Sequence, residues 1–298
     1  MARRAHSGTI RIGISGWRYG GWRGVFYPEK LPQRQELSYA AQRMSSIEIN
    51  GTFYSMQRPS SFAEWKAQTP PDFLFSVKGS RYLTHMLKLN NPLPGLANFF
   101  AQGVLALGEK LGPILWQLPP GLAFHPEKLQ NFLEVLPRTG EEAAELARAH
   151  HDHRLKGQPW LDWSGVGALR YAMEVRHSAF CCTEYINLLR QSNVASVVSD
   201  SAGRFPVIDD VTADFIYVRL HGHEHLYSGG YGDDLLRTWA DRIRAWSSGE
   251  QIPTENITHP DSKLPRHPRD VFIYFDNDAK VDAPRDAMRL EELIAREI

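Results

Sequence analysis

Eight short runs rich in β-branched and aromatic residues recur along this chain of 298 residues, and most of them precede a segment with helical periodicity. Strands that alternate with helices indicate a parallel sheet, and eight such units indicate closure into a (β/α)8 barrel. The expected strands are Arg11–Ser15, Ser45–Asn50, Phe73–Lys78, Ile114–Leu118, Leu169–Val175, Ala195–Asp200, Phe215–His221 and Val271–Asn277. The clearest expected helices are Gln35–Arg43, Ser61–Gln68, Leu96–Leu111, Pro126–Leu136, Thr183–Gln191 and Leu235–Ser247. After the sixth strand we expect a short helix or none.

The length fits one barrel with additions, because a (β/α)8 barrel takes roughly 250 residues. We expect residues 1–8 to form a flexible tail and residues 9–298 to form a single barrel domain. Two insertions, at about 138–165 and 248–270, interrupt the regular spacing. Both precede strands, so we expect them on the amino-terminal face of the barrel, away from the face that carries function.

Composition limits the partners and the cellular compartment that we expect for this protein. The formal net charge is +0, from 34 basic and 34 acidic side chains, so the chain as a whole has no electrostatic attraction to nucleic acid or to acidic membranes. The only two cysteines, Cys181 and Cys182, are adjacent and form no disulfide framework, which indicates a reducing compartment, the cytoplasm. No apolar run approaches 18 residues, so we expect no membrane span. The oligomeric state stays open.

Polar residues gather at the carboxyl ends of the expected strands. In the seventh strand, Tyr217, Arg219 and His221 alternate with apolar residues and therefore share one face. The same pattern places a further set on that face: Glu48 with Asn50, Ser76 with Lys78, Gln117, Glu174 with Arg176, Asp200 and Asn277. A barrel explains the pattern if these residues line its interior at the carboxyl-terminal mouth. An open doubly wound sheet is the alternative, but it does not need polar residues on so many strands.

Ordered sequence blocks add a resemblance to a known family. The blocks are Ile12-Gly13-Ile14-Ser15-Gly16-Trp17, Trp22-Arg23-Gly24-Val25-Phe26-Tyr27-Pro28, Glu48-Ile49-Asn50, Thr52-Phe53-Tyr54, Phe75-Ser76-Val77-Lys78, Gln117-Leu118-Pro119-Pro120, Glu174-Val175-Arg176-His177, Tyr217-Val218-Arg219-Leu220-His221-Gly222 and Tyr274-Phe275-Asp276-Asn277-Asp278. Together they resemble the domain-of-unknown-function 72 family, also called YecE-like. The resemblance implies a TIM barrel but no reaction. It departs at Asp276, where the family pattern has asparagine, and we expect that side chain to face the helices.

The mouth residues suggest acid–base or nucleophilic chemistry. We take Glu48, Lys78, Glu174 and His221 as the candidate catalytic residues. Two carboxylates on different strands can act as general acid and base, because burial and neighbouring charges separate their pKa values. Lys78 can bind an anion or form a Schiff base. The structural alternative is a network of buried ion pairs, such as Glu174 with Arg219, that only fills the barrel.

The loops at the mouth carry many aromatic and basic side chains, a combination that suits a ligand with rings and negative charge. The candidate substrate-binding residues are Trp17, Asn50, Phe53, Tyr54, Gln117, Arg176, His177, Asp200, Arg219, Tyr231 and Asn277. We therefore expect the partner to be an anionic small molecule or a fragment of nucleic acid. Packing of the rings against each other is the structural alternative.

The segment from His221 to His225 has alternating histidines, and Asp200 or Glu174 could complete a zinc site with them. Histidines in solvated loops commonly bind no metal, so we assign no metal ligand and leave the cofactor open. The leading hypothesis is an enzyme that hydrolyses a phosphoester or glycosidic bond of an anionic, ring-containing substrate. The alternative is a non-catalytic protein that binds nucleic acid or a nucleotide at the same basic, aromatic mouth.

Overall fold

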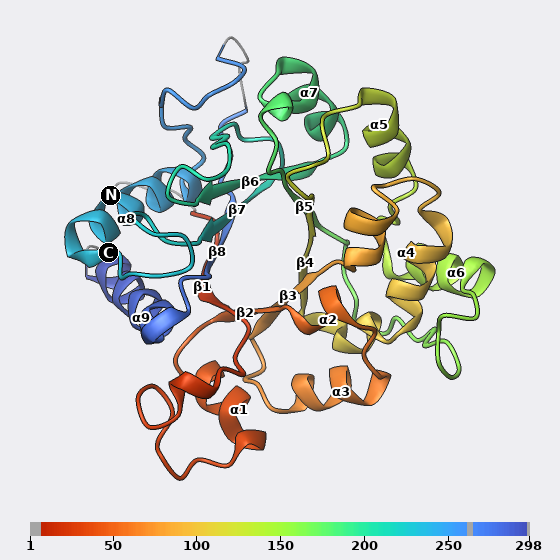
Figure 1. The fold of residues 1–298 in the computed structure, drawn as a ribbon, viewed down its shortest axis with the longest axis horizontal. Helices are drawn as coiled ribbons and strands as arrows, with labels where there is room; N and C mark the ends of the chain where they lie inside the picture. Colours follow the sequence, from red (N-terminus) through yellow and green to blue (C-terminus); the bar gives the residue numbers. More distant parts are fainter. Residues whose placement is uncertain (1–6, 261–264, 297–298) are drawn as a thin grey trace, which may run out of the picture.

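The chain folds into a closed barrel of eight parallel strands that pair in sequence order (Figure 1). The computed structural model describes residues 7–260 and 265–296. The strands are β1 Ile10–Ser15, β2 Ser46–Ile49, β3 Leu74–Lys78, β4 Leu111–Gln117, β5 Tyr171–Glu174, β6 Val194–Asp200, β7 Phe215–Leu220 and β8 Asp270–Phe275. Each expected strand overlaps an observed one, and the predicted (β/α)8 barrel is confirmed.

Helices surround the barrel in the order that the sequence indicated, with three additions. Their bounds are α1 Glu36–Ala41, α2 Gly51–Tyr54, α3 Pro59–Ala67, α4 Leu93–Ala101, α5 Pro126–Glu134, α6 Gly140–His150, α7 Thr183–Gln191, α8 Gly232–Ser247 and α9 Asp282–Ala295. We had not predicted α2, α6 and α9. The expected helix Leu96–Leu111 ends early, because Gly103 adopts a positive φ of 115° that separates α4 from a 3₁₀ segment. Between β6 and β7, where every residue is described, there is no helix.

The first insertion does not stay on the amino-terminal face, so that prediction was wrong. It contains α6, whose eleven residues span roughly 16 Å at 1.5 Å per residue, and α6 packs along α4. The turn after α6 thereby reaches the loop that follows β3. There Asp152 accepts a hydrogen bond from Asn98 at 2.9 Å, and the Arg154 guanidinium lies 4.4 Å from the Tyr82 ring centre.

The described part of the second insertion lies at the amino end of β7. Asn256 and Thr258 donate hydrogen bonds to Asp209 and Asp210, two buried carboxylates just before that strand. Of the expected tail, residues 1–6 lie outside the described residues, whereas the Gly8 amide donates to the Ser247 carbonyl at 2.9 Å.

The barrel interior changes character along its axis. Its amino-terminal part is apolar and includes Leu115, Ala172, Val197 and Phe272. Above this layer, Tyr217 and Tyr274 place their hydroxyl groups near Ser76 and Ser46, at 2.6 and 2.7 Å. Ionised residues, among them Arg219, Glu48 and Glu174, occupy the layer above the tyrosines. The apolar base thus leaves the carboxyl-terminal mouth as the polar end of the barrel.

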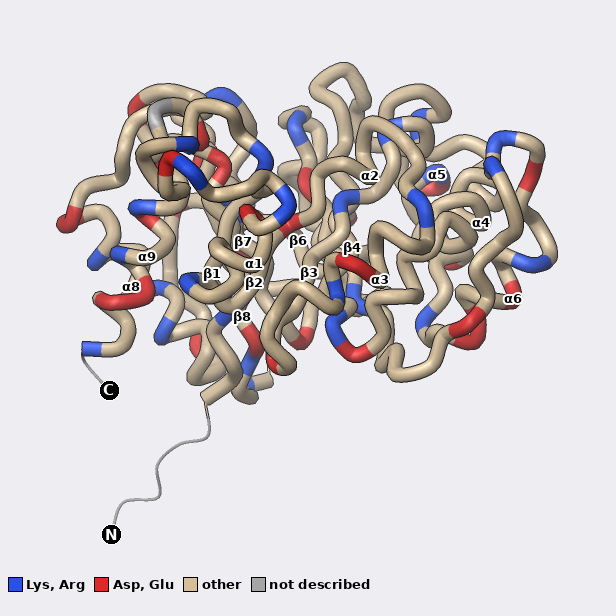
Figure 2. The backbone as a smooth tube through the Cα atoms, turned by 90° about the horizontal axis from the view of Figure 1, so that it is seen from below, with Lys and Arg blue, Asp and Glu red and all other residues tan. Residues whose placement is uncertain are grey.

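The charged positions on the outside do not form a face of one sign. In the view of Figure 2, basic and acidic positions are interspersed along the backbone, as the zero net charge suggests. None of the helices within residues 7–260 and 265–296 combines the length and apolar character that crossing a membrane requires.

Candidate functional site

Arg219 is the centre of a polar network at the carboxyl-terminal end of the barrel. The side chain is completely buried. Its Nη2 donates to Glu48 Oε1 at 2.8 Å and to the Ser15 hydroxyl at 3.0 Å, and its Nη1 donates to Glu174 Oε2 at 2.6 Å. The remaining oxygen of Glu48 accepts a hydrogen bond of 2.6 Å from the Tyr217 hydroxyl. Glu48 therefore has both oxygens occupied beneath the mouth.

Glu174 is held in a similar way from the other side. Its Oε1 accepts from Nε of Arg176 at 2.9 Å and lies 3.3 Å from Nε2 of His221. Burial alone would raise the pKa of Glu174, but Arg176, Arg219 and His221 outweigh burial and hold the pKa well below its usual range. Glu174 is thus a fixed carboxylate, and the predicted ion pair with Arg219 is present.

Asp276 brings a third carboxylate to Arg219. Its Oδ2 lies 2.8 Å from Nδ1 of His221 and accepts from Nη2 of Arg219 at 3.2 Å. Our prediction that Asp276 faces the helices was wrong. Phe275 of β8 pairs with Leu220 of β7, and both side chains pack in the helix-facing core. The residue that follows each of them, Asp276 and His221, therefore points inward. Burial would raise the pKa of Asp276, but Arg219 and His221 hold it below its usual range.

A cavity of about 520 Å³ opens above this network. It is lined by Tyr19, Asn50, Phe53, Tyr54, Lys78, His85, Gln117, Pro120, Arg176, Tyr227, Asp276 and Asp278. Lys78 and Gln117 end β3 and β4, and Asn50 and Arg176 lie one and two residues beyond the ends of β2 and β5, so these four side chains converge because parallel strands end at one edge. Six of the predicted site residues line this cavity: Asn50, Phe53, Tyr54, Lys78, Gln117 and Arg176.

Lys78 is the cation that the surrounding network does not engage. Its side chain is 7% exposed, and its Nζ lies 4.4 Å from the centre of the Phe53 ring. No hydrogen bond or ion pair joins this nitrogen to another described residue. Burial, and then the charge of Arg219, lower the pKa of Lys78 to about 8. The cavity therefore holds a buried amine that is close to its titration point at neutral pH.

Two other titratable groups face the same cavity. Burial and the neighbouring charge of Asp276 raise the pKa of Asp278 above its usual value, whereas Asp276 itself stays ionised. Burial and the nearby cation Lys78 lower the pKa of His85 to about 4, so His85 is neutral around pH 7. Asp276 and Asp278 are thus a pair of carboxyl groups whose pKa values differ, an arrangement typical of acid–base sites.

Four predicted substrate-binding residues lie elsewhere. Asp200 shares the helix-facing side of its strand with Leu220, its register partner, and its Oδ2 lies 3.0 Å from His223. Asn277 donates to Asp286 of α9 at 2.8 Å, because its position alternates with the inward Asp276. The interior positions predicted for Asp200 and Asn277 were therefore wrong.

Tyr231 and His177 have local structural contacts. The Tyr231 hydroxyl accepts the Gly222 amide at 3.0 Å, which fixes the loop after β7. The His177 ring accepts the Ala179 amide at 3.1 Å and so caps the short 3₁₀ turn after β5. Neither residue lines the mouth cavity. Arg219 is also absent from the cavity lining, since it lies beneath it, and His221 lies beside Arg219.

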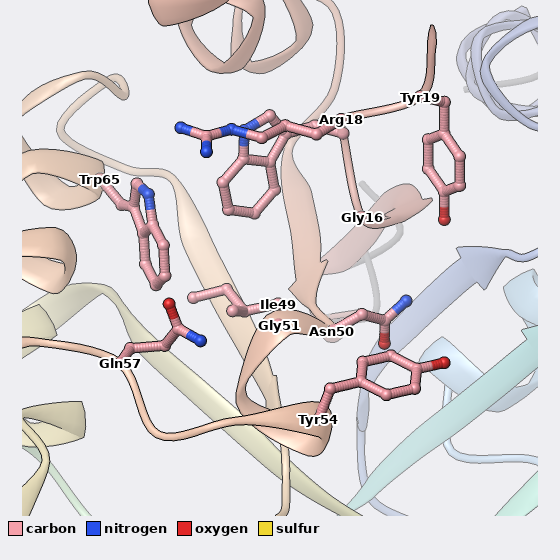
Figure 3. Close-up of a pocket in the computed structure, with 10 residues that line it drawn as sticks. Gly16, Arg18, Tyr19, Ile49, Asn50, Gly51, Tyr54, Gln57 and Trp65 are labelled. Atoms are coloured by element: carbon pink, nitrogen blue, oxygen red, sulfur yellow. The ribbon is translucent and has the colours of Figure 1, made fainter. Parts of the chain in front are cut away.

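A smaller pocket of about 300 Å³ adjoins the mouth cavity and shares Tyr19, Asn50 and Tyr54 with it. Figure 3 shows Trp65 and Gln57 at one end of this pocket and Tyr19 with Tyr54 at the other. Trp17, another predicted residue, lines it and meets Trp65 edge to face at a centroid distance of 5.4 Å. We refer to it below as the side pocket.

The predicted site residues did not include Tyr19, His85, Asp276 and Asp278, although Tyr19 and His85 lie in the aromatic and basic loops that the sequence placed at the mouth. The signal for Asp276 and Asp278 was present, because residues two apart after a strand project to the same side. The histidines after β7 give no further cluster. Within residues 7–260 and 265–296, no group of three or more His, Cys, Asp or Glu side chains is arranged to hold a metal ion.

The chain was compared with protein-family models, curated proteins and solved structures. Residues 11–298 match the family model described as Protein of unknown function DUF72. The UPF0759 protein YunF of Bacillus subtilis is 22% identical over 96% of this chain and 94% of its own. The UPF0759 protein YecE of Escherichia coli strain K12 is 23% identical, over 80% of this chain and 82% of its own.

Two crystal structures share the fold. A DUF72 family protein from Thermotoga maritima has a TM-score of 0.70 and 24% identity, covering 96% of this chain and 99% of its own. A DUF72 family protein from Enterococcus faecalis has a TM-score of 0.67 and 14% identity, covering 96% of each chain. With the family model matched across nearly the whole sequence, this chain belongs to the DUF72 family.

Proposed function

We propose that this protein is a hydrolase that acts at the barrel mouth on a phosphoester bond of an anionic, ring-containing substrate. One observation carries the proposal: the Lys78 ammonium lines a 520 Å³ cavity without a hydrogen-bond or ion-pair partner among the described residues. A buried cation without a partner is costly, and an anion in the cavity would compensate it. Arg176 lines the same cavity and offers a second cation.

The charges favour a phosphoester over a glycosidic bond, the two bonds that the sequence suggested. Transfer of a phosphoryl group develops negative charge, which Lys78 and Arg176 would stabilise. Glycoside hydrolysis passes through a transition state with positive charge on the sugar ring, and the same two cations would oppose it. Both predicted acidic candidates, Glu48 and Glu174, have their oxygens engaged by Arg219 and its neighbours, so neither is free to transfer a proton.

Asp278 is the general acid in this proposal. Its raised pKa keeps more of it protonated than an ordinary aspartate, and it lines the cavity with Lys78. Water attacks phosphorus while the ester P–O bond breaks, and the leaving oxygen takes the Asp278 proton. One proton of the attacking water then passes to the Asp278 carboxylate, which restores the acid and leaves an alcohol and inorganic phosphate. Glu48 and Glu174 position Arg219, and His221 positions Asp276.

The test is hydrolysis of 4-nitrophenyl phosphate and phenyl phosphate by the purified chain, followed as release of inorganic phosphate. We expect Lys78→Met and Asp278→Asn each to lower kcat/KM by about a hundredfold or more. The matched control is Lys66→Met, which removes a lysine that pairs with Glu109 on the outside and lines neither cavity. Undiminished hydrolysis by both mouth variants, or no phosphate release from either ester, would contradict the proposal.

A specific observation also supports the binding alternative, a non-catalytic protein for nucleic acid or a nucleotide. Tyr54 is 70% exposed and lies at the junction of the mouth cavity with a further cavity of about 360 Å³, which Arg81 and Arg154 line. An exposed ring beside two guanidinium groups suits a base and its phosphates. Fluorescence anisotropy with a labelled single-stranded oligonucleotide tests this alternative. Binding that weakens in Arg81→Ala and Arg154→Ala, without any ester hydrolysis, would favour it over the hydrolase.

A further inference from the structure

The side pocket and the mouth cavity are adjoining parts of one binding region. Tyr19, Asn50 and Tyr54 line both spaces, so a ligand in the mouth cavity lies next to the side pocket. At about 300 Å³ the side pocket lies at the lower end of the range of small-molecule sites, roughly 300–1,000 Å³. It therefore accommodates a ring system but not a long chain.

The walls of the side pocket are apolar and fixed in place. Trp17 and Trp65 are 6% and 8% exposed, and their rings meet edge to face. The Trp17 carbonyl accepts a hydrogen bond of 2.6 Å from the buried Tyr27 hydroxyl, and Trp65 also packs against Phe62 with ring centres 5.1 Å apart. Because these contacts exist without a ligand, binding would not have to order the walls first.

The composition of the lining distinguishes this pocket from the charged mouth. Ile49 and Gly51 form the middle of the pocket, between Trp65 at one end and Tyr54 at the other (Figure 3). The only formally charged side chain that lines it is Arg18. Flat aromatic walls with a guanidinium group at hand suit a planar π-system, through edge and face contacts and through cation–π contact.

Asn50 lies at the boundary of the two spaces, and its side chain has one unpaired hydrogen-bond acceptor. Its Nδ2 donates to the Ser15 hydroxyl at 2.8 Å, and that hydroxyl donates to Glu48, so the orientation of the amide is set. Its Oδ1 is buried and has no hydrogen-bond partner. A buried acceptor without a partner is costly, and a donor on the edge of a ligand would relieve that cost.

We infer that the substrate is a phosphate ester of a planar aromatic or heteroaromatic ring: the ring occupies the side pocket against Trp17 and Trp65, and the phosphate reaches Lys78 and Arg176. This inference rests on the proposed function and adds the chemical class of the substrate. It assigns the ring to residues that the proposed hydrolytic step does not use.

The test separates the ring from the phosphate by isothermal titration calorimetry of the intact chain carrying Asp278→Asn, which in the proposed mechanism keeps the esters from being hydrolysed during the titration. The probes are inorganic phosphate, isopropyl phosphate and phenyl phosphate. We expect phenyl phosphate to bind about tenfold or more tightly than inorganic phosphate, with isopropyl phosphate between them. The same titrations are made with Gly51→Ala and Gly51→Leu, which place a side chain into the side pocket.

Gly51 suits this purpose because an added Cβ would meet only the Gln57 side chain, at 3.5 Å, and Gly51 does not line the mouth cavity. We expect Gly51→Leu to remove the advantage of phenyl phosphate and to leave the affinity for inorganic phosphate unchanged, with Gly51→Ala in between. Gly167→Leu is the matched control, since its Cβ would meet nothing within 4 Å and it lines neither space.

The outcomes separate the two proposals. If inorganic phosphate binds but phenyl phosphate binds no more tightly, or if Gly51→Leu leaves the advantage intact, the ring site is overturned and the anion site stands. If neither phosphate ester nor inorganic phosphate binds, the proposed function fails and the ring inference fails with it.

Discussion

The ammonium nitrogen of Lys78 lies 4.4 Å from the centre of the Phe53 ring, and no carboxylate among the described residues forms an ion pair with it. The ring face attracts a cation, but more weakly than a carboxylate would at the same depth. The carboxylates nearby are engaged instead by Arg219, Arg176 and His221. Lys78 is therefore the least compensated charge at the mouth, and this makes the stability of the protein depend on its titration.

The first prediction concerns Lys78→Met. The folded-state pKa of about 8 lies below the ordinary value of 10.5, so the charged lysine destabilises the fold below pH 8. A pKa lowered from 10.5 to about 8 corresponds to a destabilisation of roughly 3 kcal/mol. We expect Lys78→Met to be more stable than the wild type at pH 7, with a difference that shrinks as pH rises from 8 towards 10. Urea denaturation at several pH values measures it, and a difference that is independent of pH would contradict the assignment.

The second prediction concerns Arg219→Met. Removing this guanidinium leaves Glu48, Glu174 and Asp276 without their shared partner in a buried site. We expect the free energy of unfolding to fall by about 3–5 kcal/mol. Arg237→Met is the control, because Arg237 forms solvent-exposed ion pairs with Asp233 and Asp234. This substitution should change the free energy of unfolding by about 0.5 kcal/mol or less. Equal effects of the two substitutions in a denaturant titration would refute the central place of Arg219.

The third prediction uses Asp276→Asn to lower the pKa of the proposed general acid, Asp278. The charge of Asp276 contributes to the raised pKa of Asp278, so the amide should let that pKa fall. Because the general acid works in its protonated form, the variant should lose activity at a lower pH than the wild type does. The pH profile of kcat/KM for 4-nitrophenyl phosphate shows the shift. An unchanged profile with a uniformly lower rate would mean that Asp276 supports only the structure of the site.

The sequence predicted the site well where one face of a strand is clearly polar. In β7, Arg219 and His221 alternate with Val218 and Leu220, and in β2 Glu48 lies between two isoleucines, so inward and outward positions could be distinguished. The barrel buries both faces of its strands, and β6 and β8 carry apolar residues on both. There alternation does not distinguish the two faces, so the inward positions that it gave for Asp200 and Asn277 were wrong.

Other features depend on contacts between distant segments. The side pocket forms where Trp17, after β1, meets Trp65 in α3, and no local pattern specifies that two loops will bring these rings to 5.4 Å. The course of the first insertion depends likewise on the packing of α6 against α4. Lys78 was predictable as a mouth residue from its position at the end of β3, but its lack of a partner follows only from how Arg219 engages the three carboxylates.

The most direct test of the account is the affinity of phenylphosphonate, which has no ester bond to hydrolyse, for the wild type and for Lys78→Met, measured by calorimetry at pH 7 and at pH 9.5. A charge-assisted contact of about 1.5–3 kcal/mol corresponds to a factor of about 10 to 100 in Kd. We expect the wild type to bind at least tenfold more tightly than the variant at pH 7. The difference should narrow at pH 9.5, where Lys78 loses its proton. Equal dissociation constants for the two proteins at pH 7 would contradict the claim that Lys78 is there to bind an anion.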